Sequence, residues 1–95
     1  MAAYLLVDCK VTDPAQYEEY KGAAQSAIES YGGRYLVRGG GSVALEGNWQ
    51  PNRIVVLEFP TLQQAKIFYD SPAYQAARAK RAGAAEMKII AVEGV

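Results

Sequence analysis

The chain has no histidine, a single cysteine and no excess of either charge. Without histidine it lacks the commonest general base, the commonest zinc ligand and the usual axial ligand of haem. Its ten basic and ten acidic residues cancel, so no long-range field draws nucleic acid or anionic lipid to it. We therefore expect no cofactor, no metal, no nucleic-acid partner and no membrane partner.

The single cysteine, Cys9, excludes an internal disulfide, which is typical of a reducing compartment. The N-terminus has no basic segment and its apolar run is too short for a signal peptide. No apolar stretch approaches the roughly 20 residues of a membrane-spanning helix. We expect a cytoplasmic protein of one domain, residues 1–95. A domain of this size buries about 60–65% of its unfolded surface, so a partner surface would stabilise it.

Hydrophobic periodicity predicts the order β-α-β-β-α-β. Alternation and β-branched residues indicate strands over 4–11, 34–38, 53–59 and 87–94. Capping residues and a one-sided apolar stripe predict a first helix from Asp13 to Gly32. A second helix, from 61 to about 82, is split by the Ser71–Pro72 pair. GGGS (39–42) interrupts the second strand, VALEG (43–47) is a candidate continuation, and 47–52 is a turn.

Two helices on one face of four strands make a two-layer α+β sandwich, whose second sheet face stays uncovered. Strand parity places both apolar and charged side chains on that uncovered face. They are Leu6, Leu36, Ile54, Val56, Ile90, Asp8, Arg38 and Glu58. An apolar patch of this kind is best covered by a second copy of the sheet, so we expect a homodimer.

Spaced motifs along nearly the whole chain resemble those of a family of short, mostly bacterial proteins of unknown function. The motifs are YGGR (31–34), RGG (38–40), LEG (45–47), EFP (58–60), SPAY (71–74) and VEG (92–94), together with Tyr17, Tyr20 and Arg81. The resemblance implies the dimeric α/β-barrel superfamily, in which two ferredoxin-like sheets form a barrel. Relatives there include antibiotic-biosynthesis-type monooxygenases, muconolactone isomerases and haem-binding chlorite dismutases. The haem branch uses a proximal histidine, which this chain lacks.

Arg38 and Glu58 are the first candidates for chemistry, because they occupy adjacent strands with the same predicted parity. In a pocket, Arg38 would hold a carboxylate or enolate and Glu58 would act as general base. The alternative is a cross-strand ion pair that only stabilises the sheet. Arg34 shares the parity of Arg38 but begins the strand, where a position at the rim is expected.

A second group of residues could bind a ligand. It comprises Asp8, Tyr69, Ser71, Tyr74 and Arg81. Tyr74, Arg78 and Arg81 share one helix stripe, and Ser71 begins that helix, where an anion could bind. The alternatives are a solvated helix face, core tyrosines with polar tips and a helix cap. Trp49, in a polar turn, is a candidate contact residue.

These observations favour a small cytoplasmic homodimer that binds an anionic or carbonyl-bearing metabolite near Arg38 and Glu58. If it is an enzyme, cofactor-free proton transfer or oxygenation is the chemistry that its residues allow. The competing interpretation is a binding or assembly protein without catalysis, whose charges set the register of the sheet.

Overall fold

The computed structural model describes residues 1–95 and has four strands and three helices. In chain order they are β1 (Ala3–Val11), α1 (Pro14–Ser30), β2 (Arg34–Arg38), β3 (Arg53–Phe59), α2 (Leu62–Asp70), α3 (Pro72–Lys80) and β4 (Ala85–Glu93). The order β-α-β-β-α-β and the division of the second helix are as predicted. No helix combines the length and the apolar character needed to cross a membrane.

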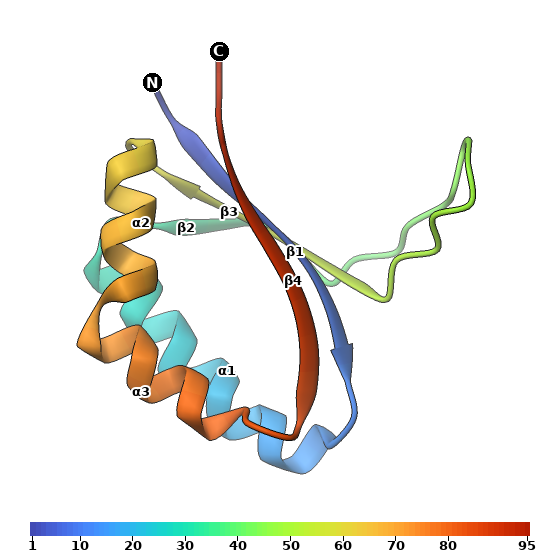
Figure 1. Cartoon of the computed structure of the whole chain (residues 1–95), viewed down its shortest axis with the longest axis horizontal. Helices are drawn as coiled ribbons and strands as arrows, with labels where there is room; N and C mark the ends of the chain where they lie inside the picture. Colours follow the sequence, from blue (N-terminus) through green and yellow to red (C-terminus); the bar gives the residue numbers. More distant parts are fainter.

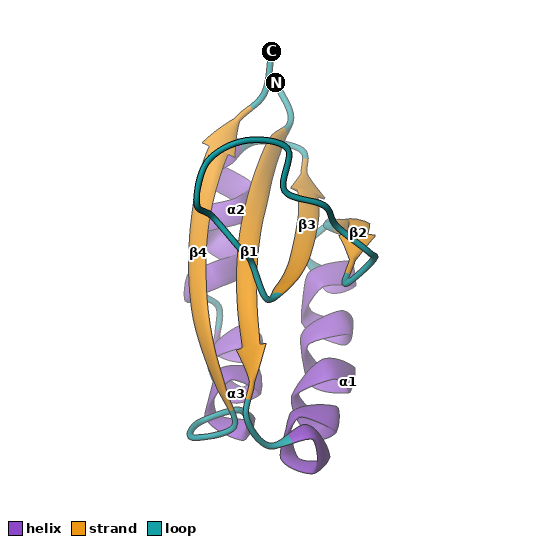
Figure 2. Ribbon diagram, turned by 90° about the vertical axis from the view of Figure 1, so that its right-hand side faces the viewer, coloured by secondary structure: helices purple, strands orange, loops and turns teal.

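The strands form one antiparallel sheet in the order β2-β3-β1-β4. All helices lie on the same side of it (Figure 1). Seen from the other side, α1 runs behind β3 and β2, whereas α2 and α3 run behind β4 and β1 (Figure 2). We call the side without helices the open face. This is the two-layer architecture expected from the sequence.

Each helix begins where a polar side chain accepts a backbone N–H, as the sequence predicts. The caps are Asp13, Thr61 and Ser71. Gln16 does not complete a capping box: its amide donates to the carbonyls of Lys80 and Ala82, at 3.0 and 2.8 Å. The start of α1 is thereby tied to the end of α3, which fixes the two helices side by side under the sheet.

The core lies between the helices and the sheet, and it contains the inward positions predicted for β1 and β3. They are Leu5, Val7, Cys9, Val55, Leu57 and Phe59. In β4, whose alternation leaves two choices, Met87 and Ile89 face the helices. Lys88 and Ile90 lie on the open face.

A bulge in β2 overturns the predicted orientation of Arg38. Arg34 and Tyr35 pair with Glu58 and Leu57, but the register then shifts, so that Arg38 pairs with Val55. A bulge inserts one residue and moves everything after it to the opposite face. Arg38 therefore points toward the helices, where its side chain reaches Gln25 of α1. The prediction that it lies on the open face was wrong.

The same shift corrects the neighbouring residue. Val37 pairs with Val56, which lies on the open face, and Val37 remains 39% exposed. Regular alternation from Tyr35, without the bulge, would instead place Val37 under the helices. Leu36, at the bulge, is exposed as well.

Residues 39–52 form no strand, so VALEG does not continue β2. Figure 1 shows this segment projecting away from the body of the protein, and in Figure 2 it crosses in front of β1 and β4. We call it the arm. Its side chains Val43, Leu45 and Trp49 are 77%, 91% and 66% exposed. Three exposed apolar side chains on one projecting segment make the arm a candidate for contact with another molecule.

One buried glycine and one exposed glycine give a matched test of core packing. A Cβ at Gly33 would lie 2.6 Å from the ring of Phe59 and 2.9 Å from Ile28, whereas one at Gly22 of α1 would meet nothing within 4 Å. Gly33→Ala should destabilise the fold by roughly 1–3 kcal/mol through overpacking. Gly22→Ala should stabilise it by about 0.5–1 kcal/mol, because alanine favours helix. Urea unfolding of both variants tests this, and equal shifts would contradict it.

Candidate functional site

A small cavity lies between the helices and the sheet, and we call it the helix-side cavity. Its volume is about 40 Å³, room for a few water molecules and too little for an organic ligand without rearrangement. Its lining comes from all four strands and all three helices, so it spans the width of the sheet from β2 to β4.

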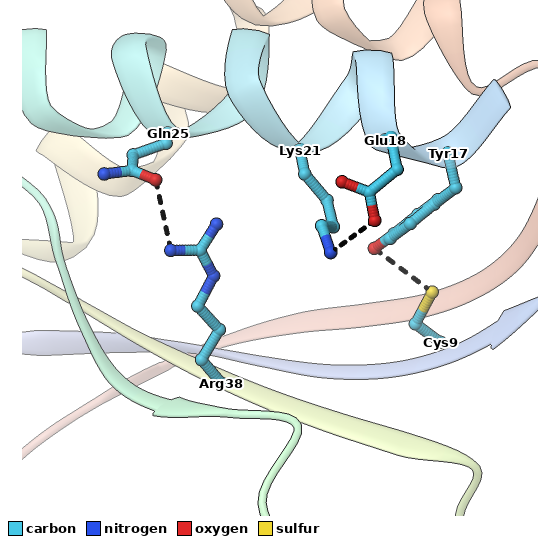
Figure 3. A network of polar contacts seen from close by, with 6 residues as sticks. All are labelled: Cys9, Tyr17, Glu18, Lys21, Gln25 and Arg38. Carbon is cyan, nitrogen blue, oxygen red and sulfur yellow. Dashed lines mark hydrogen bonds and ion pairs between the residues drawn. The ribbon is translucent and has the colours of Figure 1, made fainter. Parts of the chain in front are cut away.

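Five of the seven tyrosines line the helix-side cavity: Tyr17, Tyr20, Tyr35, Tyr69 and Tyr74. The hydroxyls of Tyr20 and Tyr74 lie 2.6 Å apart and share a buried hydrogen bond. The thiol of Cys9 donates to the Tyr17 hydroxyl at 3.4 Å (Figure 3). Five phenol rings in one lining form an apolar wall whose hydroxyl groups can still make hydrogen bonds.

Three of these phenols, those of Tyr17, Tyr20 and Tyr35, have a raised pKa and stay protonated near neutral pH. Burial raises the pKa of Tyr17, and the hydrogen bond with Cys9 adds to the rise. Burial also raises the pKa of Tyr20, with the nearby Tyr74 contributing, and burial raises the pKa of Tyr35. A neutral phenol can donate a hydrogen bond to an oxyanion but cannot serve as a base near neutral pH.

The charged side chains that line the helix-side cavity are Lys21, Arg38 and Arg53, and no carboxylate lines it. Arg38 rises from β2 toward α1 (Figure 3), donates to Gln25 at 3.1 Å and stacks over Tyr35, 4.3 Å from the ring centroid. Lys21 is paired with Glu18 at 2.9 Å. Neither arginine has a carboxylate within 4.0 Å. The guanidinium groups of Arg38 and Arg53 are thus free to hold an anion where β2 and β3 line the cavity.

Glu58 does not belong to this site. It lies on the open face, where its Oε1 accepts from Arg34 Nε at 2.7 Å. The predicted meeting of Arg38 and Glu58 was wrong, because the bulge turns Arg38 to the other side of the sheet. The ion pair considered as the structural alternative does form, but with Arg34. The helix-side cavity therefore has no carboxylate that could act as a general base.

Asp8 also lies on the open face, where it holds the end of the arm. Its carboxylate accepts from the backbone N–H of Asn52 at 2.9 Å and from the Trp49 indole at 3.4 Å. The Asn52 contact lowers the pKa of Asp8, burial opposes this change, and the indole reinforces it. Beside it lies an open groove of about 330 Å³ lined by Leu6, Trp49 and other apolar side chains. Asp8 thus orders an apolar surface.

The other predicted ligand-binding residues do not all lie in one site. Ser71 is buried, donates to the Phe68 carbonyl and accepts from Tyr74 N, so capping uses its hydroxyl. Tyr69 and Tyr74 line the helix-side cavity. Arg81 is half-buried outside it, with its guanidinium carbon 5.3 Å from the Tyr20 ring centroid. No three His, Cys, Asp or Glu side chains come close enough together to hold a metal ion.

Arg53 was missed as a site residue, although the sequence carried a signal for it. It has the same parity as Val55 and Leu57, which were assigned to the core, so it had to point toward the helices. A Cβ at Gly39 would lie 2.5 Å from Arg53 Nε, and Gly39 has φ +73°. Both facts favour glycine at this position, since any side chain there would displace Arg53.

The architecture defines a ferredoxin-like α+β protein, as expected from the sequence. The chain belongs to the DUF1330 family, a domain of unknown function whose model matches residues 2–95. No curated protein matches it. The family resemblance drawn from its motifs is confirmed.

Solved structures with this fold cover 99% of the chain. A protein of unknown function from Rhodopseudomonas palustris is 18% identical with a TM-score of 0.76, over 82% of its own chain. A cofactor-independent oxygenase from Streptomyces nogalater is 9% identical with a TM-score of 0.67, over 93%. A dimeric ferredoxin-like protein of unknown function from Thermobifida fusca is 15% identical with a TM-score of 0.63, over 92%. At these identities the likeness shows the fold alone.

The contact between Asp8 and the arm should survive mild acid. Because the pKa of Asp8 is lowered in the folded state, its contribution is complete above the unfolded value of about 3.9 and is lost as pH falls through the lower folded value. Trp49 is the only tryptophan, so its fluorescence anisotropy reports on the arm. We expect constant anisotropy from pH 7 to about pH 4 and a fall below it.

Two variants provide controls for this titration. Asp8→Ala should show the low anisotropy at every pH, whereas Glu46→Gln, which removes an exposed carboxylate within the arm, should keep the transition. If Glu46→Gln lacks the transition, the transition comes from Glu46, and the predicted role of Asp8 is contradicted.

Proposed function

We propose that this chain is a self-associating cytoplasmic protein whose helix-side cavity binds a small anionic or enolisable carbonyl compound. The observation that carries the proposal is the charge of the lining: Arg38 and Arg53 without a carboxylate beside neutral tyrosines. An apolar chamber with a few convergent polar groups is the usual form of a small-molecule site. The carboxylate or enolate would lie against the guanidinium groups, with the apolar body among the aromatic rings.

The same residues limit the chemistry. With no carboxylate or histidine in the helix-side cavity, the protein cannot readily abstract a proton there, but guanidinium and phenol donors can stabilise an oxyanion that has formed. We infer that any reaction begins with a substrate acidic enough to enolise with little help. Oxygenation of such an enolate needs no cofactor to activate the substrate, and the fold shared with a cofactor-independent oxygenase supports this direction.

Self-association through the open face is supported by its composition and by the dimeric relative from Thermobifida fusca. Leu6, Ile90 and Val92 are 39%, 61% and 43% exposed on that face. Covering them with a second sheet would stabilise a dimer by roughly 25 cal/mol for each Å² removed from water. The arm projects from this face (Figure 2), so a second copy would lie against Trp49 as well.

The competing function is assembly without a ligand, and one observation favours it. The helix-side cavity holds about 40 Å³, so ligand binding requires side chains to move. The two functions differ in whether Arg38 affects binding of an anion or only the stability of the sheet.

Phenylpyruvate, an enolisable oxo acid with an apolar ring, is a suitable probe of the cavity. We expect it to raise the unfolding temperature of the wild type. Arg38→Gln should weaken its binding about ten- to a hundredfold, since a charge-assisted hydrogen bond contributes roughly 1.5–3 kcal/mol. Arg34→Gln, on the same strand but paired with Glu58 on the open face, is the matched control and should bind normally. Equal binding by both variants would favour assembly alone.

A lysine on the open face should abolish self-association without unfolding the chain. Leu6→Lys would bury an unpaired ammonium in the interface, which should raise the dimer dissociation constant at least roughly a hundredfold. Ile67→Lys is the control, because Ile67 is 46% exposed on α2, on the other side of the molecule. Sedimentation equilibrium measures both, and a Leu6→Lys dimer of unchanged affinity would place the interface elsewhere.

A further inference from the structure

The helix-side cavity adjoins a second, larger depression between α3 and β4. This outer groove is open to solvent, has a volume of about 1010 Å³, and its lining includes Arg78, Arg81 and Gln75. It shares Tyr69, Met87 and Ile89 with the helix-side cavity. The two spaces therefore adjoin along these three residues.

Tyr69 is the partition between them. Its ring lies 5.6 Å from Tyr74 inside and 4.6 Å from the Arg78 guanidinium carbon outside. It is half-buried near the end of α2.

The outer groove carries a surplus of positive charge. Arg78 and Arg81 line it together with one carboxylate, Asp70, and neither arginine takes part in an ion pair. Arg81 Nε is buried and has no hydrogen-bond acceptor in the chain. A buried donor without an acceptor is costly, and the Arg81 guanidinium, which lies 5.3 Å from the Tyr20 ring centroid, has no carboxylate partner to offset that cost.

Guanidinium groups therefore line both spaces. Arg38 and Arg53 come from β2 and β3, whereas Arg78 and Arg81 come from α3 and its C-terminal cap, in the groove between α3 and β4. The aromatic rings between them carry no charge. Three strand spacings separate β2 from β4, about 14 Å in all.

We propose that the outer groove is the second half of the ligand site, and that the ligand is an apolar-bodied dianion with carboxylates at opposite ends. One carboxylate binds Arg38 and Arg53, the other binds Arg78 and Arg81, and Tyr69 moves aside to admit the middle. This inference rests on the proposed function of the helix-side cavity. It adds the class of ligand and the path by which it enters.

The test compares α,ω-dicarboxylates from glutarate to sebacate with their monomethyl esters, using calorimetry on the full chain. For the diacid whose length fits the two spaces we expect about tenfold or tighter binding than for its monoester. Arg78→Gln should remove this advantage. Lys80→Gln changes an exposed cation on the same helix that does not line the groove, and it should keep the advantage.

The result separates this inference from the one on which it rests. If phenylpyruvate binds in a manner that depends on Arg38 but no diacid exceeds its monoester, the second anion site is overturned and the proposed function stands. If Lys80→Gln removes the advantage as fully as Arg78→Gln, the effect is general charge and the groove is not a site. If neither probe class binds, both proposals fail.

The association and dissociation rates of the diacid test the role of Tyr69. Tyr69→Ala should speed both association and dissociation of the best diacid, because the partition is gone. Tyr31→Ala removes another tyrosine that packs on Phe68, at 6.4 Å between ring centroids, and that lines neither space. Exchange rates from NMR line shapes that are the same in both variants would exclude entry past Tyr69.

Discussion

The bulge in β2 determines the chemistry of both faces of the sheet. Before it, Arg34 faces away from the helices and neutralises Glu58; after it, Arg38 faces toward them. Without the inserted residue, Arg38 and Glu58 would share the open face and the helix-side cavity would lose a guanidinium. A shift of one residue in a strand exchanges its two faces completely, so a local irregularity decides where the charge of the protein lies.

The consequence is a division between the two faces. The open face carries a neutral ion pair, an ordered carboxylate at Asp8 and exposed aliphatic side chains, a composition suited to contact with another protein surface. The helix side carries unpaired guanidinium groups and protonated phenols around a chamber, a composition suited to an anion. Because the sheet separates the two faces, each is suited to a different kind of partner. Substitutions on one face should therefore leave the other intact.

Much of this fold could be read from periodicity and capping. The strands, the three helix starts and the inward set of β1 and β3 follow from alternation and from Asp13, Thr61 and Ser71. The bulge could not be predicted, because the sequence from Leu36 to Arg38 is equally compatible with a regular strand. The glycines at 39–41 signalled irregularity nearby but not which residue would be inserted. VALEG has strand-forming residues but finds no partner strand within one chain, so it stays in the arm.

The candidate site was less predictable because it depends on distances between elements. Tyr69 and Tyr74 could be named from their helix stripe, whereas Arg53 needed its parity to be followed through to the first residue of β3. The absence of a base has the widest consequence. Guanidinium and phenol donors in a low-dielectric chamber lower the energy of an anion, and they do so most when charge is concentrated on oxygen. A site built only from donors favours compounds that already carry, or readily form, such an oxyanion, so in the proposed function the acidity of the ligand itself decides which compounds fit.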